Sequence, residues 1–215
     1  MDVHLGFNSL NNFQGGGERF DLNDGIRFFN AVEYSLHWLE ANSEAINRLN
    51  VYPVPDGDTG TNMVLTLRAA VREAGESGSS DVKGVAVALG RGALLGARGN
   101  SGVILSQILR GFSEGLSDSC ELGVLEFASA LAAAAEVAYQ AVTDPVEGTI
   151  LTVVRDAGVA ATSAVSHVDS IEDLLAVVVD ASRKSVANTP NQLAVLAEAG
   201  VVDAGGQGLQ VIFEG

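Results

Sequence analysis

Apolar residues recur at intervals of three or four along most of the chain, as the buried face of an amphipathic helix requires. One such series is Ile26, Phe29, Val32, Leu36 and Leu39. The same spacing predicts further helices over 63–74, 103–116, 122–142, 149–166 and 171–187. Strand signals are few, because prolines interrupt the run after Val51 and Tyr52. The pattern therefore predicts an all-α, antiparallel bundle of about eight helices.

Three local signals predict helix ends in the second half of the chain. Ser170 followed by Asp173 resembles a capping box at the start of the 171–187 helix. Thr189 and Pro190 look like an N-cap followed by proline at the first helical position, and Gly200 looks like the stop of that helix. A separate helix is therefore expected between Pro190 and Gly200.

The composition fits one compact domain. The chain has 215 residues, of which 47% are hydrophobic, so it has enough apolar side chains for a core. Residues 1–20 are expected to be a flexible N-terminal segment and residues 21–215 the folded domain. The apolar pattern at 211–213 shows no stop signal before the final residues, so we expect a fragment of a longer, multidomain protein.

The charge balance excludes several classes of partner. A formal charge of −15 argues against binding to nucleic acid or to an anionic membrane surface, since phosphates would be repelled. No stretch approaches the roughly 20 apolar residues of a membrane span. The single cysteine, Cys120, cannot form a disulfide within the chain, and we therefore expect a cytoplasmic protein.

The acidic character is not uniform. Residues 51–100 contain five acidic and five basic side chains, whereas each of the other segments is strongly acidic. This neutral segment is where we would first look for an anionic ligand. Glycines concentrate in three clusters, at 56–60, 96–102 and 205–208, and each cluster precedes a predicted helix start. Free N–H groups at helix N-termini favour anions, so the clusters predict a nucleotide site if they converge.

The first glycine cluster also carries two carboxylates. Asp56 and Asp58 are separated by one glycine, and Asn50 or Asn62 could add a carbonyl oxygen to a Mg²⁺ site. An EF-hand loop starting at Asp56 fails, because its sixth and twelfth positions are Thr61 and Leu67 rather than glycine and glutamate. A phosphatase with an aspartyl nucleophile stays as an alternative, although the preceding prolines make a poor strand.

The second and third clusters offer main-chain donors. The N–H groups before the 103–116 helix and the Ser101 hydroxyl are candidates for binding a β-phosphate, with Arg98 as a nearby positive contact. The third cluster contains one carboxylate, Asp203, and Thr149 lies at the start of the 149–166 helix. Neither a P-loop motif nor a dinucleotide-binding G-x-G-x-x-G unit is present.

Four motifs together resemble a known family. They are N-x-Y-P-V-P-D-G-D-T-G-T-N-M at 50–63, G-A-R-G-N-S-G at 96–102, G-T-x-L-T-V at 148–153 and V-D-A-G-G-x-G at 202–208. In this order they resemble the nucleotide-binding domain of the bacterial fatty acid kinases, which is similar to the ADP-binding DhaL subunit of dihydroxyacetone kinase. The resemblance covers roughly residues 21–215. It implies an α-helical barrel that holds Mg²⁺ and ATP at one end.

The resemblance assigns roles motif by motif. Asp56 and Asp58 match the magnesium carboxylates, and Asn50 is the nearest counterpart of a third aspartate in the dihydroxyacetone kinase relative. That relative has histidine where this chain has Thr59, which is also expected to contact nucleotide. Asp203 matches a loop that closes over the ribose and base. The remaining residues expected to contact nucleotide are Gly60, Thr61, Asn62, Met63, Gly99, Asn100, Ser101, Gly102, Thr149, Gly205 and Gly206.

The implied function is that of a fatty acid kinase. Such an enzyme transfers the γ-phosphate of ATP to a fatty acid held by a DegV-type carrier protein, and a homodimer is possible. A fatty acid carboxylate is already ionised at neutral pH and needs no general base. Three alternatives stay open: a dihydroxyacetone (glycerone) kinase-like nucleotide subunit, a nucleotide sensor that phosphorylates nothing, and a metal-dependent phosphohydrolase.

Overall fold

The computed structural model describes residues 25–117 and 122–215, and the predictions for residues 1–20 and for Cys120 lie outside these ranges. Within them the chain forms helices only, which confirms the predicted all-α class. The helices are α1 (Gly25–Asn47), α2 (Thr59–Glu76), α3 (Val82–Gly96), α4 (Gly99–Gly115), α5 (Val124–Gln140), α6 (Ile150–Ala164), α7 (Ile171–Gln192), α8 (Ala194–Ala199) and α9 (Ala204–Glu214).

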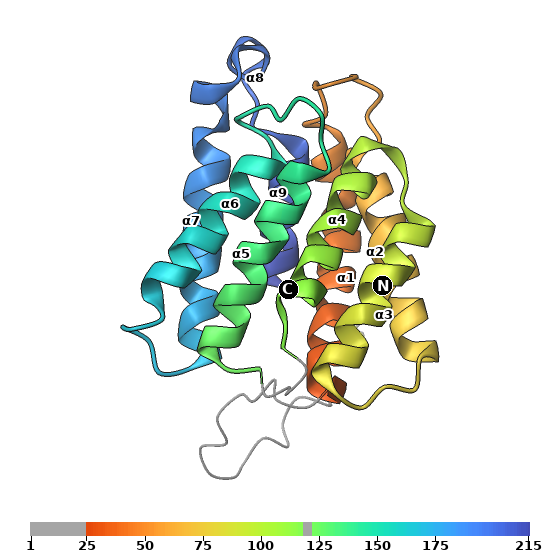
Figure 1. Cartoon of the computed structure of the whole chain (residues 1–215). Helices are drawn as coiled ribbons and strands as arrows, with labels where there is room; N and C mark the ends of the chain where they lie inside the picture. The colour runs from red at the N-terminus through yellow and green to blue at the C-terminus, as the bar shows by residue number, and fades with distance from the viewer. Residues whose placement is uncertain (1–24, 118–121) are drawn as a thin grey trace, which may run out of the picture.

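The long helices form a closed antiparallel bundle (Figure 1). Each of α1 to α7 packs against the next helix in the sequence, and α9 packs against α1, α6 and α7, which closes the bundle. Because the chain runs alternately up and down, α2, α4, α6 and α9 all begin at the same end, the top of Figure 1. No helix among the described residues combines the length and hydrophobicity needed to cross a lipid bilayer.

Small residues bring α4 and α5 close together. A Cβ atom added to Gly111 of α4 would lie 2.7 Å from Cα of Ala134, and one added to Gly115 would lie 2.7 Å from Cα of Ala130. Side chains larger than hydrogen at these two positions would force the helices apart. The alanine-rich composition of α5 therefore serves close packing as well as helix propensity.

The predicted helix ends are confirmed at two positions and wrong at a third. The Ser170 side chain accepts a hydrogen bond from the N–H of Asp173 at the start of α7, and Gly200 ends α8 in the left-handed conformation, with φ of 68°. The expected break at Thr189 is absent, because α7 continues through Pro190 to Gln192.

Thr189 explains how the helix passes the proline. Pro190 has no N–H to donate to the carbonyl of Val186, four positions earlier. The Thr189 hydroxyl donates to that carbonyl at 2.7 Å instead. The same oxygen accepts from the N–H of Asp203 at 3.0 Å, so Thr189 also ties α7 to the start of α9.

We expect the substitution Thr189→Val to lower the free energy of unfolding by about 3 kcal/mol, because it leaves the Val186 carbonyl and the Asp203 N–H buried without partners. Urea unfolding followed by circular dichroism measures this loss. The matched control is Thr162→Val on α6, where the exposed hydroxyl donates only to the Gly158 carbonyl. Equal losses in the two variants would show that Thr189 has no special role.

Candidate functional site

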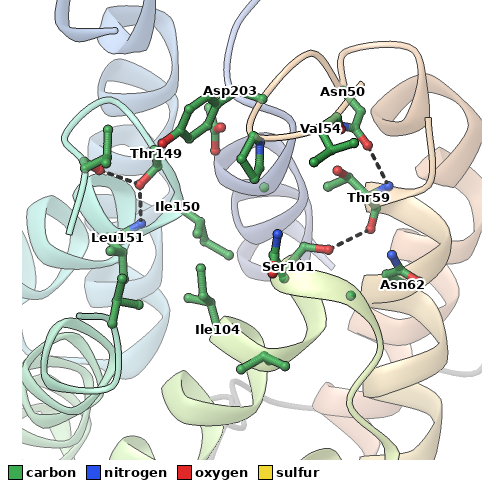
Figure 2. Close-up of a pocket in the computed structure, with 18 of the residues that line it drawn as sticks. Asn50, Val54, Thr59, Asn62, Ser101, Ile104, Thr149, Ile150, Leu151 and Asp203 are labelled. Atoms are coloured by element: carbon green, nitrogen blue, oxygen red, sulfur yellow. Dashed lines mark hydrogen bonds between the residues drawn. The ribbon is translucent and has the colours of Figure 1, made fainter. Parts of the chain in front are cut away.

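A pocket of about 470 Å³ lies at the end of the bundle where α2, α4, α6 and α9 begin (Figure 2). This volume is within the range of small-molecule sites. The lining includes eleven of the predicted site residues: Asn50, Asp56, Asp58, Thr59, Asn62, Gly99, Asn100, Ser101, Thr149, Asp203 and Gly205. The three glycine clusters therefore converge on one pocket, which is the condition under which they predict a nucleotide site.

Asn50 holds the acidic loop in place. Its side-chain oxygen accepts from the N–H groups of Asp58 and Thr59, at 3.2 and 3.3 Å, and its amide nitrogen donates to the Val54 carbonyl at 2.9 Å. The amide is thus engaged with the backbone on both sides, and Asn50 positions the loop. Its suggested role as a metal ligand stays a prediction.

The two carboxylates of this loop have no cationic partner among the described residues. Asp58 occupies the N-cap position of α2, but its side chain makes no capping hydrogen bond. Asp56 is exposed and Asp58 partly exposed, and both line the pocket. Two such carboxylates suit Mg²⁺, which usually binds one or two of them and completes its shell with water and phosphate oxygens.

The described residues offer no cluster of three or more histidine, cysteine, aspartate or glutamate side chains that could hold a metal ion. Any ion at Asp56 and Asp58 would therefore take most of its ligands from elsewhere, which fits Mg²⁺ bound together with a phosphate-bearing ligand.

The N-terminus of α4 lies beside the start of α2 at the pocket. The first main-chain bond of this helix runs from Gly102 to the Arg98 carbonyl, so the N–H groups of Gly99, Asn100 and Ser101 precede it and have no partner within the described protein. All three residues line the pocket, and the Ser101 side chain reaches toward Thr59 (Figure 2). Such amides, together with the helix dipole, favour an anion.

Asp203 lines the pocket as the buried N-cap of α9. Its carboxylate accepts from the N–H of Gly206 at 2.7 Å, and it also bonds the N–H groups of Gly205 and Ile150. It therefore joins the first turn of α9 to the first turn of α6. Burial raises the pKa of Asp203 to about 6, while these backbone hydrogen bonds act in the opposite direction.

Thr149 caps α6 at the pocket. Its hydroxyl accepts from the N–H of Leu151 at 3.4 Å and donates to the Val146 carbonyl at 2.8 Å. Thr149 is almost fully buried, so it contributes only a small area to the lining. The two hydrogen bonds fix the position of its hydroxyl.

One wall of the pocket is apolar, and the sequence motifs did not predict its residues. Figure 2 shows Ile104, Ile150 and Leu151 on the side of α4 and α6, opposite Asn50, Thr59 and Asn62, with Ser101 between the two groups. The other apolar residues of the lining are Val54, Val103, Ala141, Val142 and Val146. Their position next to the polar motifs is the only signal in the sequence that could have found them.

Six predicted residues lie outside the lining: Gly60, Thr61, Met63, Arg98, Gly102 and Gly206. Met63 is fully buried in the core against Gly208, and a Cβ on Gly102 would meet the Thr66 hydroxyl. Thr61 bonds Asn47 of α1 through both its N–H and its hydroxyl. Arg98 is exposed, and its backbone N–H donates to Thr66. These residues shape the helix starts that carry the pocket.

Comparison with known proteins places the chain in a family. The model of the DAK2 domain matches residues 53–215, so the chain belongs to the DAK2 domain family. It is 46% identical over 192 residues to Protein YloV of Bacillus subtilis, covering 89% of this chain and 35% of that protein. An uncharacterised protein of Staphylococcus epidermidis is 49% identical over 177 residues, covering 82% of this chain and 32% of the relative.

The chain thus spans about a third of the length of these relatives. Its fold is similar to that of dihydroxyacetone kinase from C. freundii, whose crystal structure contains AMP-PNP and Mg²⁺. The TM-score is 0.63 at 19% sequence identity, and the match covers 100% of this chain and 36% of the kinase. This similarity establishes the shared all-α fold.

The raised pKa of Asp203 predicts a measurable effect of pH on stability. Because its pKa is about 6 in the folded chain and 3.8 ordinarily, the folded state holds the extra proton between these values. The contribution of Asp203 to stability is therefore fully present below pH 3.8 and falls by about 3 kcal/mol as the pH rises through 6. Urea unfolding at pH 4 and pH 7 measures the free energy of unfolding of the wild type and of Asp203→Asn. Between these pH values it should fall more in the wild type than in the variant. Parallel pH dependence in the two proteins would contradict it.

Proposed function

We propose that this domain binds ATP with Mg²⁺ and transfers the γ-phosphate to the carboxylate of a fatty acid held by a DegV-type carrier protein, giving ADP and an acyl-phosphate. One observation carries the nucleotide part of this proposal. The unpaired carboxylates of Asp56 and Asp58 and the unengaged amides at the start of α4 line the same pocket.

The charges of the lining support a metal-dependent nucleotide site. Asp56, Asp58, Asp144 and Asp203 line the pocket, and no lysine, arginine or histidine among the described residues does so. A polyphosphate alone would be repelled by the acidic loop. Mg²⁺ bound to Asp56 and Asp58 would neutralise this repulsion and polarise the phosphate oxygens.

The rest of the lining suits the other parts of a nucleotide. The amides of Gly99, Asn100 and Ser101 are placed to bind phosphate oxygens, and the same donors would stabilise charge that develops during transfer. The apolar wall around Ile104 and Leu151 offers a surface for a base. The polar and apolar halves lie side by side, as a nucleotide requires.

The proposed transfer is chemically balanced without a general base. A carboxylate oxygen of the fatty acid forms a bond to the γ-phosphorus, the bond from that phosphorus to the bridging oxygen breaks, and ADP leaves with the electron pair. No proton moves, because the acid is already ionised. The lining contains no histidine, lysine or cysteine among the described residues, which suits such an acceptor. The four sequence motifs favour this acceptor over a hydroxyl compound.

We expect Asp58→Asn, and separately Asp56→Asn, to weaken binding of ATP in the presence of Mg²⁺ at least about tenfold, because each removes one of the two charges offered to the ion. Calorimetric titration with and without Mg²⁺ measures this. The control, Asp180→Asn, makes the same change of charge on α7, where Asp180 pairs with Lys184. Unchanged affinity in both loop variants would refute the metal assignment.

We expect residues 1–215 alone to bind nucleotide but to form no acyl-phosphate, because the relatives are about three times as long and the lipid is carried by another protein. Incubation with ATP, Mg²⁺ and loaded carrier, compared with the same reaction of the longer protein, tests this expectation. Steady release of phosphate without any acceptor would favour the phosphohydrolase. Binding without transfer, even by the longer protein with carrier, would favour the nucleotide sensor.

A further inference from the structure

The connection between α5 and α6 forms a complete wall of the pocket without regular structure of its own. Residues 141–149 contain no helix, and Ala141, Val142, Asp144, Val146 and Thr149 all line the pocket. Only the two ends of this segment adjoin helices, since Ala141 follows α5 and Thr149 caps α6. The residues between these ends need further contacts to fix their orientation.

Glu147 supplies the densest set of these contacts. Its Oε1 accepts from the Tyr139 hydroxyl of α5 at 2.9 Å and from Arg155 of α6 at 2.7 Å. Its Oε2 accepts from the same Arg155 nitrogen at 2.7 Å and from the Thr152 hydroxyl at 2.9 Å. One side chain of the loop is thus bonded to both flanking helices, and none of these partners lines the pocket.

Thr152 links Glu147 to Thr149 at the edge of the pocket through hydrogen bonds. While its hydroxyl donates to Glu147, its oxygen accepts from the N–H of Gly148 at 2.8 Å and from the N–H of Thr149 at 3.5 Å. Thr149 is the pocket-lining cap of α6. Two hydrogen bonds therefore separate the Glu147 carboxylate from a residue of the site.

The partners of Glu147 are themselves fixed. Nε and Nη2 of Arg155 donate to one carboxylate oxygen of Asp156, at 3.2 and 3.0 Å, and the other oxygen accepts from Ser185 of α7 at 2.6 Å. The guanidinium also lies over the Tyr139 ring, 5.9 Å from its centre. Because these bonds engage the guanidinium on several sides, we assign Arg155 to the loop contact rather than to a separate anion site in the groove that it lines with Tyr139.

Gly148 brings the loop close to α7. Gly148 has φ of 79°, which L side chains rarely adopt, and an added Cβ would lie 2.9 Å from the Thr189 carbonyl oxygen. The loop therefore packs closely against α7 at Gly148 and is bonded to α5 and α6 through Glu147.

The carboxylate of Glu147 is charged at neutral pH. Burial opposes its ionisation, but the hydrogen bonds from Thr152, Arg155 and Tyr139 lower its pKa below the ordinary value.

We infer that Glu147, held by Tyr139, Thr152 and Arg155, is a positioning residue that sets the 141–149 wall in the orientation that binds nucleotide. The inference rests on the proposed function, because it assumes that the pocket is the nucleotide site. It goes beyond that proposal by assigning a role in binding to four side chains that lie outside the pocket lining.

The main test compares two glutamate variants that each weaken one partly exposed ion pair, Glu147 with Arg155 and Glu40 with Arg68. Glu147→Gln keeps the shape of the side chain but removes the charge that Arg155 bonds. Glu40→Gln is the matched control, because Glu40 of α1 accepts from Arg68 of α2 at 2.7 Å and contributes nothing to the pocket lining. We expect Glu147→Gln to weaken ATP binding with Mg²⁺ about fivefold, and Glu40→Gln to change it less than twofold, although both lose a partly exposed pair.

Two further readouts separate positioning from general stability. In the nucleotide-free protein, Glu147→Gln should speed hydrogen exchange of the Gly148 and Thr149 amides at least about fivefold, while the amides of α2 keep the wild-type rate. In a double-mutant cycle, Glu147→Gln combined with Arg155→Gln should bind ATP no more weakly than the worse single variant, because both remove the same contact.

The outcomes distinguish the two proposals. A lowered melting temperature with unchanged ATP affinity in Glu147→Gln would show that the contact is merely structural and overturn the inference, while the nucleotide site would stand. An unchanged rate of hydrogen exchange at the Gly148 and Thr149 amides in Glu147→Gln would also overturn the inference, whether or not the protein binds ATP. Failure of the wild-type chain to bind ATP would instead refute the proposed function.

Discussion

The architecture of the site follows from one constraint: the first N–H groups of a helix have no partner within the helix. The helices α2, α4, α6 and α9 begin at the same end of the bundle, and side chains of the protein bond amides at three of these starts. Asn50 and Asn47 bond the start of α2, and Asp203 bonds the starts of α6 and α9. Of these four helices, α4 alone begins with three amides that have no partner among the described residues. An anion is the natural partner for them.

The same constraint explains why the acidic residues have different roles. Asp203 is buried, and its carboxylate accepts hydrogen bonds from backbone N–H groups, so its role is structural. Asp58 is also at a helix start, but there the side-chain oxygen of Asn50 accepts from the backbone N–H groups in its place. The Asp58 carboxylate is thereby left available. The amide of Asn50 thus bonds the backbone of the loop, while the Asp58 carboxylate makes no capping hydrogen bond and lines the pocket.

Sequence patterns predicted the parts of this molecule that depend on local chemistry. The helical class, the Ser170 cap and the Gly200 stop follow from short-range rules, whereas the convergence of the three glycine clusters depends on how the helices pack. The break at Thr189 was wrong because a side-chain hydroxyl replaces the missing N–H of Pro190, which depends on one rotamer. The apolar wall and the Glu147 contact could not be predicted, because their residues come from different helices and are brought together only by packing.

The walls of the pocket differ in how firmly the fold holds them. The α2 and α4 sides are continuous with long helices in the core, where Leu67 and Leu105 are fully or almost fully buried. The wall at 141–149 adjoins helices only at its two ends, and between them the partly exposed Glu147 and Arg155 bond it to α6. Partly exposed pairs are individually weak, so this wall should open at lower free energy than the rest. The affinity of the pocket for a ligand should therefore depend most on the contacts that hold this weaker side.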